Sequence, residues 1–194
     1  MQLRVTYYGE PILEQPTATV ESFGPELERL SKDMIETMYT EEGVGLAAPQ
    51  VDSDRRLCVI DVGHLPPEEL SYEIDGRRPP IDLLMPMTLV NPRLRSVPGD
   101  VETGEEGCLS FPGIRGPVPR ASAIEVDYQD LSGQAHQLRC SGWFARVVQH
   151  EVDHLDGVLF IDRMAKTAYK QIEGPVRRLR RQTQRALLKT KPSL

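Results

Sequence analysis

The chain has 194 residues, of which 39% are hydrophobic and 27% are charged, a size and composition typical of one compact globular domain. No apolar run approaches the roughly 20 residues that a membrane-spanning helix needs, and the N-terminus lacks the basic start and apolar stretch of a signal peptide. We therefore expect a cytoplasmic protein that does not contact a membrane. In that reducing compartment, Cys58, Cys108 and Cys140 are expected to be free thiols or metal ligands.

The formal net charge of −6 is unevenly distributed along the chain. Residues 175–194 contain seven basic residues and no acidic one, whereas residues 1–174 contain the other 16 basic residues and all 29 acidic ones, which gives them a formal charge of −13. A basic segment on an acidic body is typical of a chain that binds a polyanion through that segment. We therefore divide the chain into a body, residues 1–174, and a basic C-terminal tail, residues 175–194.

Hydrophobic periodicity predicts the elements of the first two thirds of the chain. Apolar residues at steps of three and four predict a helix over 26–39, and a β-branched run predicts a buried strand over 55–62. The prolines and acidic residues of 63–86 predict a long surface loop inserted in the body. Strand patterns return at 87–97 and at 121–140, where a Ser-Gly pair is placed to turn the second segment into a hairpin.

The period then changes from that of a strand to that of a helix. A helix is predicted over 142–157, with Ser141 as a candidate N-cap and Gly157 at its end. A last helical pattern begins near Asp162, is interrupted at Gly174-Pro175 and starts again with that proline in its first turn. The order of elements predicts an α+β fold in which antiparallel β-sheets pack around the 142–157 helix, with one helix near each end of the chain.

The segment 150–154 reads His-Glu-Val-Asp-His, an H-E-x-x-H motif on the predicted helix. Residues four apart share one face of a helix, so both imidazoles can bind one metal ion while Glu151 reaches a water molecule at an open coordination position. The alternative is that two histidines fell at this spacing by chance. The chain has only four histidines, which makes the metal-binding interpretation the stronger one.

A catalytic metal site of this kind needs a third ligand, and no histidine or cysteine follows His154. Cys108 is our candidate because Gly107 before it permits unusual backbone geometry, and a thiolate with two imidazoles leaves one position open for water. Cys58 and Cys140 are rivals. Each belongs to a strand-like run, in which a lone cysteine is more typically a small buried hydrophobic residue.

Three segments resemble, in this order, the three motifs of the peptide deformylase family. They are GVGLAAPQ at 43–50, EGCLS at 106–110 and QHEVDHLDG at 149–157. Lesser likenesses, GEPIL, VNP and FPGIRGPVPRA, extend the resemblance over most of residues 5–165. It implies that residues 1–174 form a single catalytic domain of a metallohydrolase, which removes the formyl group from N-formylmethionine at the start of new bacterial and organellar polypeptides. It also implies Fe(II) as the native ion, although the ligand set suits zinc or another divalent ion as well.

Residue by residue, the resemblance implies the three metal ligands Cys108, His150 and His154. It makes Glu151 the general acid/base and Gln50 an oxyanion donor, and the backbone N–H of Leu109 is expected to be a second donor. The expected reaction is attack of a metal-activated water on the formyl carbon, after which Glu151 passes the proton to the departing amine.

Methionine specificity requires an apolar pocket beside the metal, between the GVG loop and the helix of the histidines. Our candidate substrate-binding residues are Gly43, Val44, Gly45, Glu106, Gly107, Arg115, Phe144 and Val147. For Phe144 and Val147, ordinary core packing is an equal alternative, and Arg115 either holds the peptide or pairs with an acidic neighbour. The peptide backbone is expected to pair with an exposed sheet edge.

Three other interpretations fit these features less well. GVGLAA mimics a dinucleotide-binding G-x-G-x-x-A, but that fingerprint needs a strand before it and a helix after it, and here a helix precedes and a proline follows. A zinc endopeptidase shares H-E-x-x-H but takes its third ligand downstream. A metal-stabilised RNA-binding module explains the tail but has no need of the glutamate. The tail is either a solvated terminal helix or, as the resemblance implies, a helix that docks on ribosomal RNA.

Overall fold

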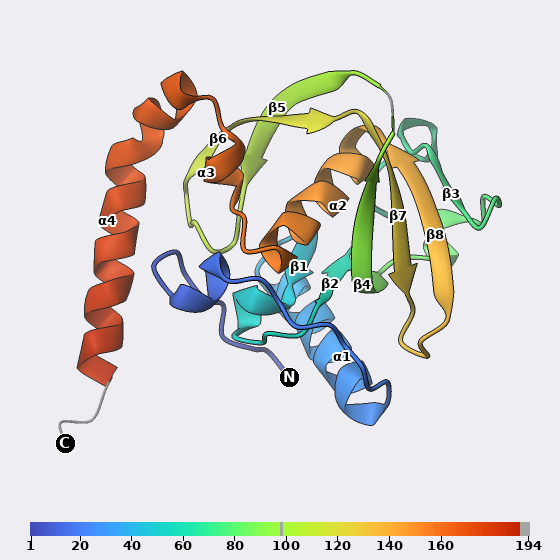
Figure 1. Cartoon of the computed structure of the whole chain (residues 1–194), viewed down its shortest axis with the longest axis horizontal. Helices are drawn as coiled ribbons and strands as arrows, with labels where there is room; N and C mark the ends of the chain where they lie inside the picture. Colours follow the sequence, from blue (N-terminus) through green and yellow to red (C-terminus); the bar gives the residue numbers. More distant parts are fainter. Residues whose placement is uncertain (98, 191–194) are drawn as a thin grey trace.

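The computed structural model describes residues 1–97 and 99–190. These residues form a six-stranded sheet, a separate two-stranded sheet and four α-helices (Figure 1). In chain order the helices and strands are α1 (Pro25–Thr40), β1 (Gly45–Ala47), β2 (Leu57–Ile60), β3 (Tyr72–Ile74), β4 (Met87–Ser96), β5 (Val101–Gly107), β6 (Arg115–Ala121), β7 (Ala123–Gln129), β8 (Ala135–Ser141), α2 (Gly142–Leu155), α3 (Phe160–Arg163) and α4 (Lys166–Thr190).

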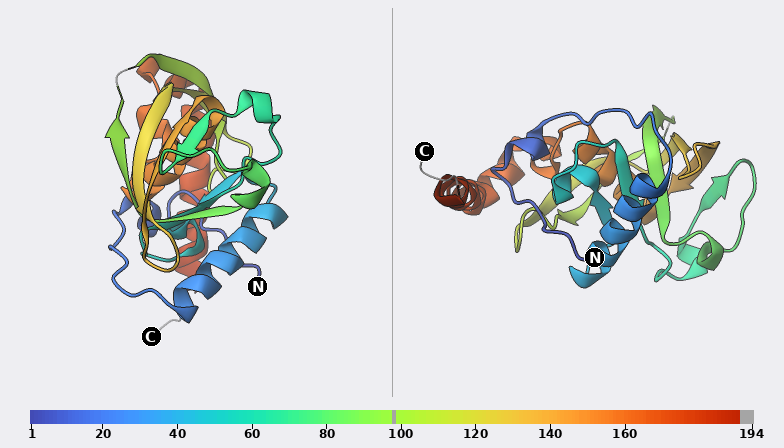
Figure 2. Two further views of the ribbon diagram at one scale, coloured as in Figure 1. Left: turned by 90° about the vertical axis from the view of Figure 1, so that its right-hand side faces the viewer. Right: turned by 90° about the horizontal axis from the view of Figure 1, so that it is seen from below.

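All strand pairs within the two sheets are antiparallel, as the sequence predicts. The larger sheet has the strand order β1-β2-β4-β7-β8-β3, and β5 pairs with β6 to form the smaller one. Helix α2 contacts strands of both sheets, and the two views of Figure 2 show it enclosed between them. The α+β prediction with a central helix is confirmed.

The central position of α2 follows from its composition. Every residue from Phe144 to Leu155 is buried, because the polar residues of the helix have partners as well as the apolar ones: Arg146 and His150, for example, bond to Glu106 of the β5–β6 hairpin. Its apolar residues join those of the larger sheet in one core cluster. Ser141 is the N-cap residue but makes no side-chain capping bond, and Gly157 follows the helix with a φ of +71°, a left-handed conformation that glycine adopts readily.

The predicted elements at 26–39, 55–62, 87–97 and 121–140 are confirmed, with ends shifted by a few residues. The turn between β7 and β8 uses the predicted Ser-Gly pair. The Asp130 carboxylate accepts hydrogen bonds from the backbone N–H groups of Ser132 and Gln134, and Gly133 has a φ of +86°, so local side-chain and glycine chemistry together close the hairpin.

The segment 63–86 is more structured than predicted. Strand β3 lies within it and pairs with β8 at the edge of the larger sheet, and Leu70, Tyr72 and Ile81 are buried in the core of that sheet. The prediction of a surface loop was wrong here because three well-spaced apolar side chains suffice to anchor the segment. Its prolines and acidic residues flank these anchors.

The C-terminal helical pattern also differs from its prediction. A short α3 ends at Arg163, and α4 then runs without interruption through Gly174 and Pro175. A proline inside a helix removes one backbone hydrogen bond and strains the preceding turn, but Ile172, Val176 and Leu179 pack on either side of it against a second apolar cluster. The predicted restart at 175 is therefore wrong, and the boundary between body and tail falls inside one helix.

Residues 191–194 of the predicted tail, including Lys191, lie outside the described residues. Figure 1 shows α4 along one side of the molecule, next to the N-terminal segment. In the part of the chain that the structure describes, no helix combines the length and the apolar character that would let it cross a membrane.

The β5–β6 hairpin was not predicted. The segment carries Pro117 and Pro119, which argue against a strand within a sheet because proline cannot donate to the ladder. Here β6 pairs with β5 alone, and prolines two residues apart present their nitrogens on the same edge. The second edge of a two-stranded ribbon accommodates them without loss of a hydrogen bond.

Candidate metal centre

Two elements bring the three predicted metal ligands together. Cys108 follows directly after β5, whereas His150 and His154 lie one turn apart on α2. The three ligand atoms all lie within 4.8 Å of one another, and Cys108 Sγ lies 3.3 Å from His154 Nε2. Tetrahedral coordination with ordinary metal–sulfur and metal–nitrogen bond lengths separates ligand atoms by roughly 3.5 Å. The residues present therefore fit a single metal ion.

The two rival cysteines are buried in strands of the larger sheet. Cys58 lies in β2 and Cys140 in β8, and both belong to its core cluster. Burial raises the pKa of both thiols well above the usual value, because a thiolate loses its solvation there. Both are hydrophobic core residues, which leaves Cys108 as the cysteine beside the histidines.

Glu106 orients one of the histidines. Its carboxylate lies 2.9 Å from His150 Nδ1, an arrangement in which Nδ1–H donates to the carboxylate and Nε2 remains available to a metal. The same carboxylate accepts hydrogen bonds from Arg120 and Arg146. Burial alone raises the pKa of Glu106, but the hydrogen bonds from His150 and Arg120 outweigh burial and lower this pKa to about 2. The carboxylate is therefore ionised at neutral pH.

A second buried carboxylate, that of Asp153, binds Arg120 on the side away from Glu106. Asp153, on α2, forms ion pairs with Arg120 and Arg163. Arg120 thus bridges Glu106 on β5 and Asp153 on α2, and all three of these side chains are buried. Buried charges are tolerated only when they are paired and hydrogen-bonded, a condition that this network meets.

His154 lies deeper than His150. Burial lowers the pKa of His154 well below its usual value, so its imidazole is neutral as a metal ligand must be. Its Nδ1 is buried without a hydrogen-bond partner among the described residues.

Glu151 is the third functional residue on α2. It is buried and lines the same pocket as Cys108 and His150, and its Oε2 has no hydrogen-bond partner in the described part of the chain. Burial raises the pKa of Glu151 to about 7, and the charge of Glu106 reinforces that shift. A carboxyl group whose pKa lies near neutrality is suited to taking up and releasing a proton.

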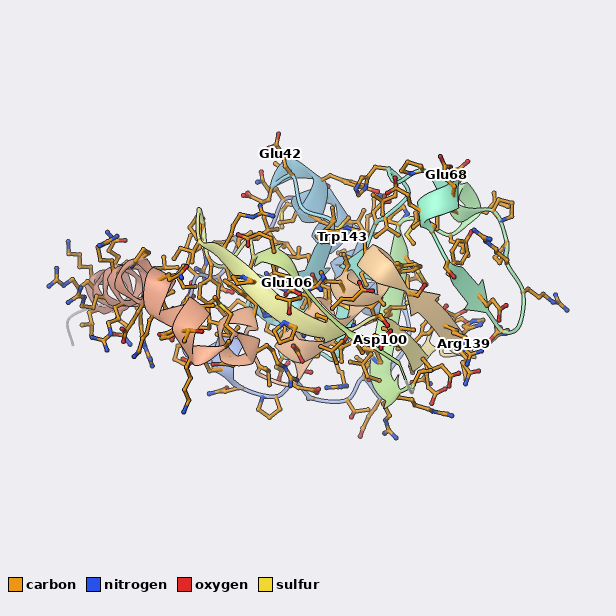
Figure 3. All side chains as sticks on the ribbon, turned by 90° about the horizontal axis from the view of Figure 1, so that it is seen from above. Glu42, Glu68, Asp100, Glu106, Arg139 and Trp143 are labelled. Carbon is orange, nitrogen blue, oxygen red and sulfur yellow. The ribbon has the colours of Figure 1, made fainter. Side chains whose placement is uncertain are left out.

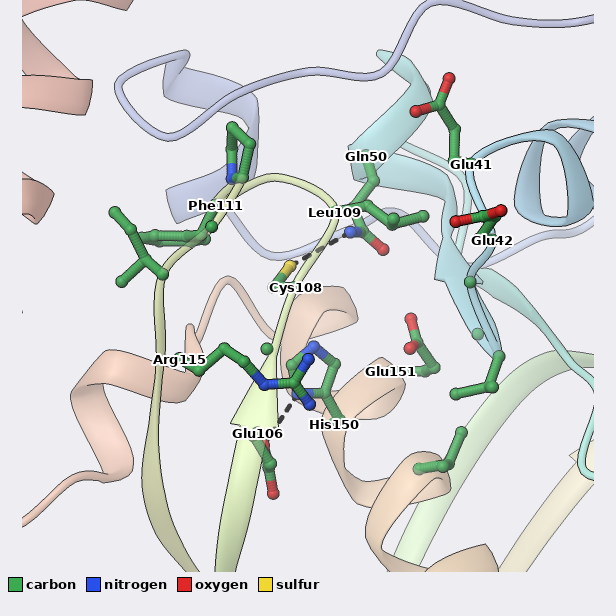
Figure 4. Close-up of a pocket in the computed structure, with 18 of the residues that line it drawn as sticks. Glu41, Glu42, Gln50, Glu106, Cys108, Leu109, Phe111, Arg115, His150 and Glu151 are labelled. Carbon is green, nitrogen blue, oxygen red and sulfur yellow. Dashed lines mark hydrogen bonds and ion pairs between the residues drawn. The ribbon is translucent and has the colours of Figure 1, made fainter.

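The close approach of β1 to Glu151 requires a glycine. A Cβ atom built on Gly45 would overlap the Glu151 carboxylate, and three atoms of that side chain would lie within 3 Å of it. Gly45, the second glycine of the GVG segment, thus lets the strand pass directly against the carboxylate. Figure 4 shows Glu151 pointing into the space between α2 and this strand.

Gln50 is held at the sulfur side of the cluster. It lies in a 3-10 turn, Ala48–Val51, and its Oε1 accepts the backbone N–H of Ala47 at 2.8 Å. This bond turns Nε2 toward Cys108, to whose Sγ it donates at 3.3 Å (Figure 4). Nε2 also donates to Ser110 Oγ at 3.2 Å. An amide donor fixed in this way can serve an anion that forms beside the cysteine.

A pocket of about 510 Å³ opens onto the cluster. Gln50 and Leu109 line it, as do all but one of the predicted substrate-binding residues: Gly43, Val44, Gly45, Glu106, Gly107, Arg115 and Val147. Phe144 is the exception. Its ring packs edge-on against Tyr72 in the core of the larger sheet, so the structure supports core packing, the alternative that was open for this residue, and not substrate binding.

Several pocket residues were missed by the sequence analysis. Glu41 and Glu42 come directly before the GVG loop, and Trp143 and Arg146 lie seven and four residues before His150. The helical spacing that paired the two histidines also places Trp143 and Arg146 on their face, so the signal was present. Figure 3 shows Trp143 and Glu106 in the middle of the molecule and Glu68, of the 63–86 segment, toward the end opposite α4.

Comparison with known proteins identifies the family. The sequence model of the family described as polypeptide deformylase matches residues 2–170. A peptide deformylase of Opitutus terrae is 45% identical over 194 residues, the full length of both chains. The crystal structure of a Thermotoga maritima peptide deformylase, 38% identical, superposes with a TM-score of 0.72 over 85% of this chain and 99% of that one. A plant peptide deformylase, 32% identical, gives 0.81 over 95% and 92%. The chain therefore belongs to the polypeptide deformylase family.

Proposed function

We propose that Cys108, His150 and His154 hold one divalent metal ion, and that at this site the chain catalyses the reaction of its family. In that reaction the formyl amide of an N-terminal formylmethionine is hydrolysed with the help of a metal ion, and formate is released. The chain is accordingly a hydrolase. One observation carries the assignment of the site. A cysteine sulfur and two imidazoles converge within 4.8 Å, and a buried carboxylate oxygen of the adjacent Glu151 has no partner in the described structure.

The proposed native ion is Fe(II), with Zn(II) or another divalent ion bound after purification. Thiolate and imidazole ligands accept several first-row metals, so the ion present depends on supply. When bound, a divalent ion polarises a carbonyl oxygen and lowers the pKa of water.

The proton transfers are assigned to Glu151. Its Oε2 is free to accept a proton from the attacking water and then to donate it to the departing amine. The pocket that surrounds this carboxylate is closed on one side by Gly45, so the carboxylate has little room to turn away from the substrate.

Stabilisation of the negative charge that develops on the formyl oxygen is assigned to two hydrogen-bond donors. Gln50 Nε2 is fixed beside Cys108 by the Ala47–Gln50 hydrogen bond, and the backbone N–H of Leu109 lies in the turn that follows Cys108. Donors already aimed at the developing charge need no reorganisation during the reaction.

The methionine side chain is assigned to the pocket between the GVG loop and α2. Val44 and Val147 give it apolar walls, and Arg115, from the start of β6, lies at its opening. The substrate is the nascent polypeptide, which places the proposed work of the chain in the cytoplasm, at the ribosome.

The tail is proposed to contact ribosomal RNA. Arg178, Arg181 and Arg185 lie on one exposed face of α4 at steps of three and four, opposite the face that packs through Val176 and Leu179. Arginines on such a face suit phosphate contacts, whose strength falls with salt.

The first test is formate release from a formyl-Met tripeptide by anaerobically purified, metal-loaded protein. We expect release by the wild type, and at least a 100-fold lower rate for Glu151→Ala with the same metal content, since the proton acceptor is missing. Removal of the metal with a chelator should abolish the activity. Absence of release by wild-type protein with one bound metal would overturn the proposed function.

Gln50→Ala tests the oxyanion assignment. The variant should retain its metal, because Gln50 is not a ligand, and should lose on the order of 100-fold in turnover. Metal content is measured on the same sample as turnover. Near-normal turnover in metal-replete protein would contradict the role of Gln50.

Gly45→Ala tests the tight packing of β1 on Glu151. The added methyl group overlaps the Glu151 carboxylate and should displace it, lowering turnover by roughly 100-fold while the metal content stays unchanged. Gly174→Ala is the matched control, because no atom crowds its position. Wild-type turnover of Gly45→Ala would show that the carboxylate does not need this position.

Charge removal on α4 tests the ribosome contact. The triple variant Arg178→Gln, Arg181→Gln and Arg185→Gln keeps the buried side chains of the helix, so free formyl-peptides should still be hydrolysed at the wild-type rate. Co-sedimentation with ribosomes at low salt should be lost. Arg139→Gln, which removes an exposed arginine of β8, is the control. Unchanged co-sedimentation of the triple variant would contradict the proposal.

A further inference from the structure

Arg146 connects the helix of the histidines to the hairpin of the cysteine. It lies on α2, one turn before His150. Its Nη1 donates to Glu106 Oε1 and to the carbonyl oxygen of Val118, both at 2.8 Å, and its Nη2 donates to the carbonyl oxygen of Glu102 at 2.7 Å. Glu102 and Glu106 belong to β5 and Val118 to β6. One side chain thus binds both strands of the hairpin.

Three features, all independent of the histidines, fit a guanidinium group at this position. Arg146 is only 8% exposed, so its charge is held by its partners and not by solvent. Its planar fork can reach three acceptors at once, which an ammonium group cannot do in a fixed geometry. Gly104 of β5 makes room for it, because a Cβ atom there would lie 2.9 Å from Arg146 Cζ.

The metal ligands depend on this connection because they come from different parts of the fold. Cys108 is carried by the β5–β6 hairpin, which forms a sheet of its own. His150 and His154 are carried by α2, which packs on the larger sheet. The separation between the sulfur and the imidazoles is therefore set by how the hairpin sits on the helix. Glu106 lies two residues before Cys108, and it receives Arg146 on one carboxylate oxygen and His150 on the other.

We propose that Arg146 is a positioning residue of the metal centre, which fixes the hairpin on α2 and thereby holds Cys108 at the distance from the histidines that retains the metal. This inference rests on the ligand set proposed above. It assigns Arg146 no contact with substrate or metal. Loss of groups that orient metal ligands typically weakens metal affinity by about 10- to 100-fold.

The experiment measures metal retention and needs no substrate. Co(II)-loaded protein is mixed with excess chelator, and metal loss is followed by the decay of the thiolate-to-cobalt absorption band. Arg146→Met should release cobalt about 10- to 100-fold faster than wild type. Arg146→Lys should fall in between, because the ammonium group keeps one charge near Glu106 but cannot bind all three acceptors.

Gly104→Ala tests the same contact without removing the arginine. The added methyl group should displace the guanidinium and accelerate cobalt release in the same direction as Arg146→Met. This variant also keeps the proposal testable if Arg146→Met does not fold. Gly174→Ala, at an uncrowded position of α4, should release cobalt at the wild-type rate.

Arg56→Met is the matched control for loss of a multiply bonded arginine. Like Arg146, Arg56 donates to two carbonyl oxygens and one carboxylate, those of Pro92, Leu155 and Asp156. It binds the C-terminal end of α2, so a general loosening of that helix would appear in this variant as well. Cobalt release at the wild-type rate from Arg56→Met, with faster release from Arg146→Met, supports a specific positioning role.

Two results would overturn the proposal. One is cobalt release from both Arg146→Met and Gly104→Ala at the wild-type rate, and the other is equal acceleration by Arg56→Met. A failure of the underlying ligand set looks different, because the thiolate-to-cobalt band would then be missing from wild-type protein and metal content would be unaffected by Cys108→Ala.

Discussion

The buried carboxylate of Glu106 is the interaction on which the rest of the site depends. It receives His150 from α2, Arg120 from β6 and Arg146 from α2, and it stands two residues before Cys108. Breaking a buried ion pair by removing one partner costs about 3 to 5 kcal/mol, because a charge is left uncompensated in a medium of low polarity. The network therefore has to be complete, and a complete network fixes the hairpin, the helix and the histidine ring in one arrangement.

Helix α2 serves the core and the site with the same 14 residues. Its apolar residues fill the space under the larger sheet, His150 and His154 face the hairpin, and Glu151 lies against the edge strand β1. Rigidity needed for chemistry is thus obtained from packing, since close-packed interiors resist displacement of their side chains. The burial that provides this rigidity also raises the pKa of Glu151 to about 7, so stability and proton transfer have a common physical origin.

The C-terminal helix shows a similar division between two faces. Ile172, Val176 and Leu179 join the apolar cluster that contains Tyr8, Phe111 and Phe160, and the Phe160 ring stacks near that of His150. The outer face carries the arginines. A helix anchored through one face can present charge on the other without loss of its fold, and for this reason the surface can be altered by mutation separately from the catalytic site.

Local patterns by themselves determined the helices over 26–39 and 142–157, the main strands, the H-E-x-x-H pair and the family, because periodicity and short motifs act over a few neighbouring residues. Tertiary structure decided what depends on contacts between distant segments. The strand inside 63–86 forms because β8 offers an edge, Pro117 and Pro119 are tolerated because β6 has only one partner, and α4 passes through Pro175 because Val176 is packed beneath it. Phe144 and Arg146 illustrate the same limit at the site. Both lie on the predicted helix, but the placement of the hairpin turns Arg146 toward Glu106, and the packing of Tyr72 from the larger sheet holds Phe144 in the core.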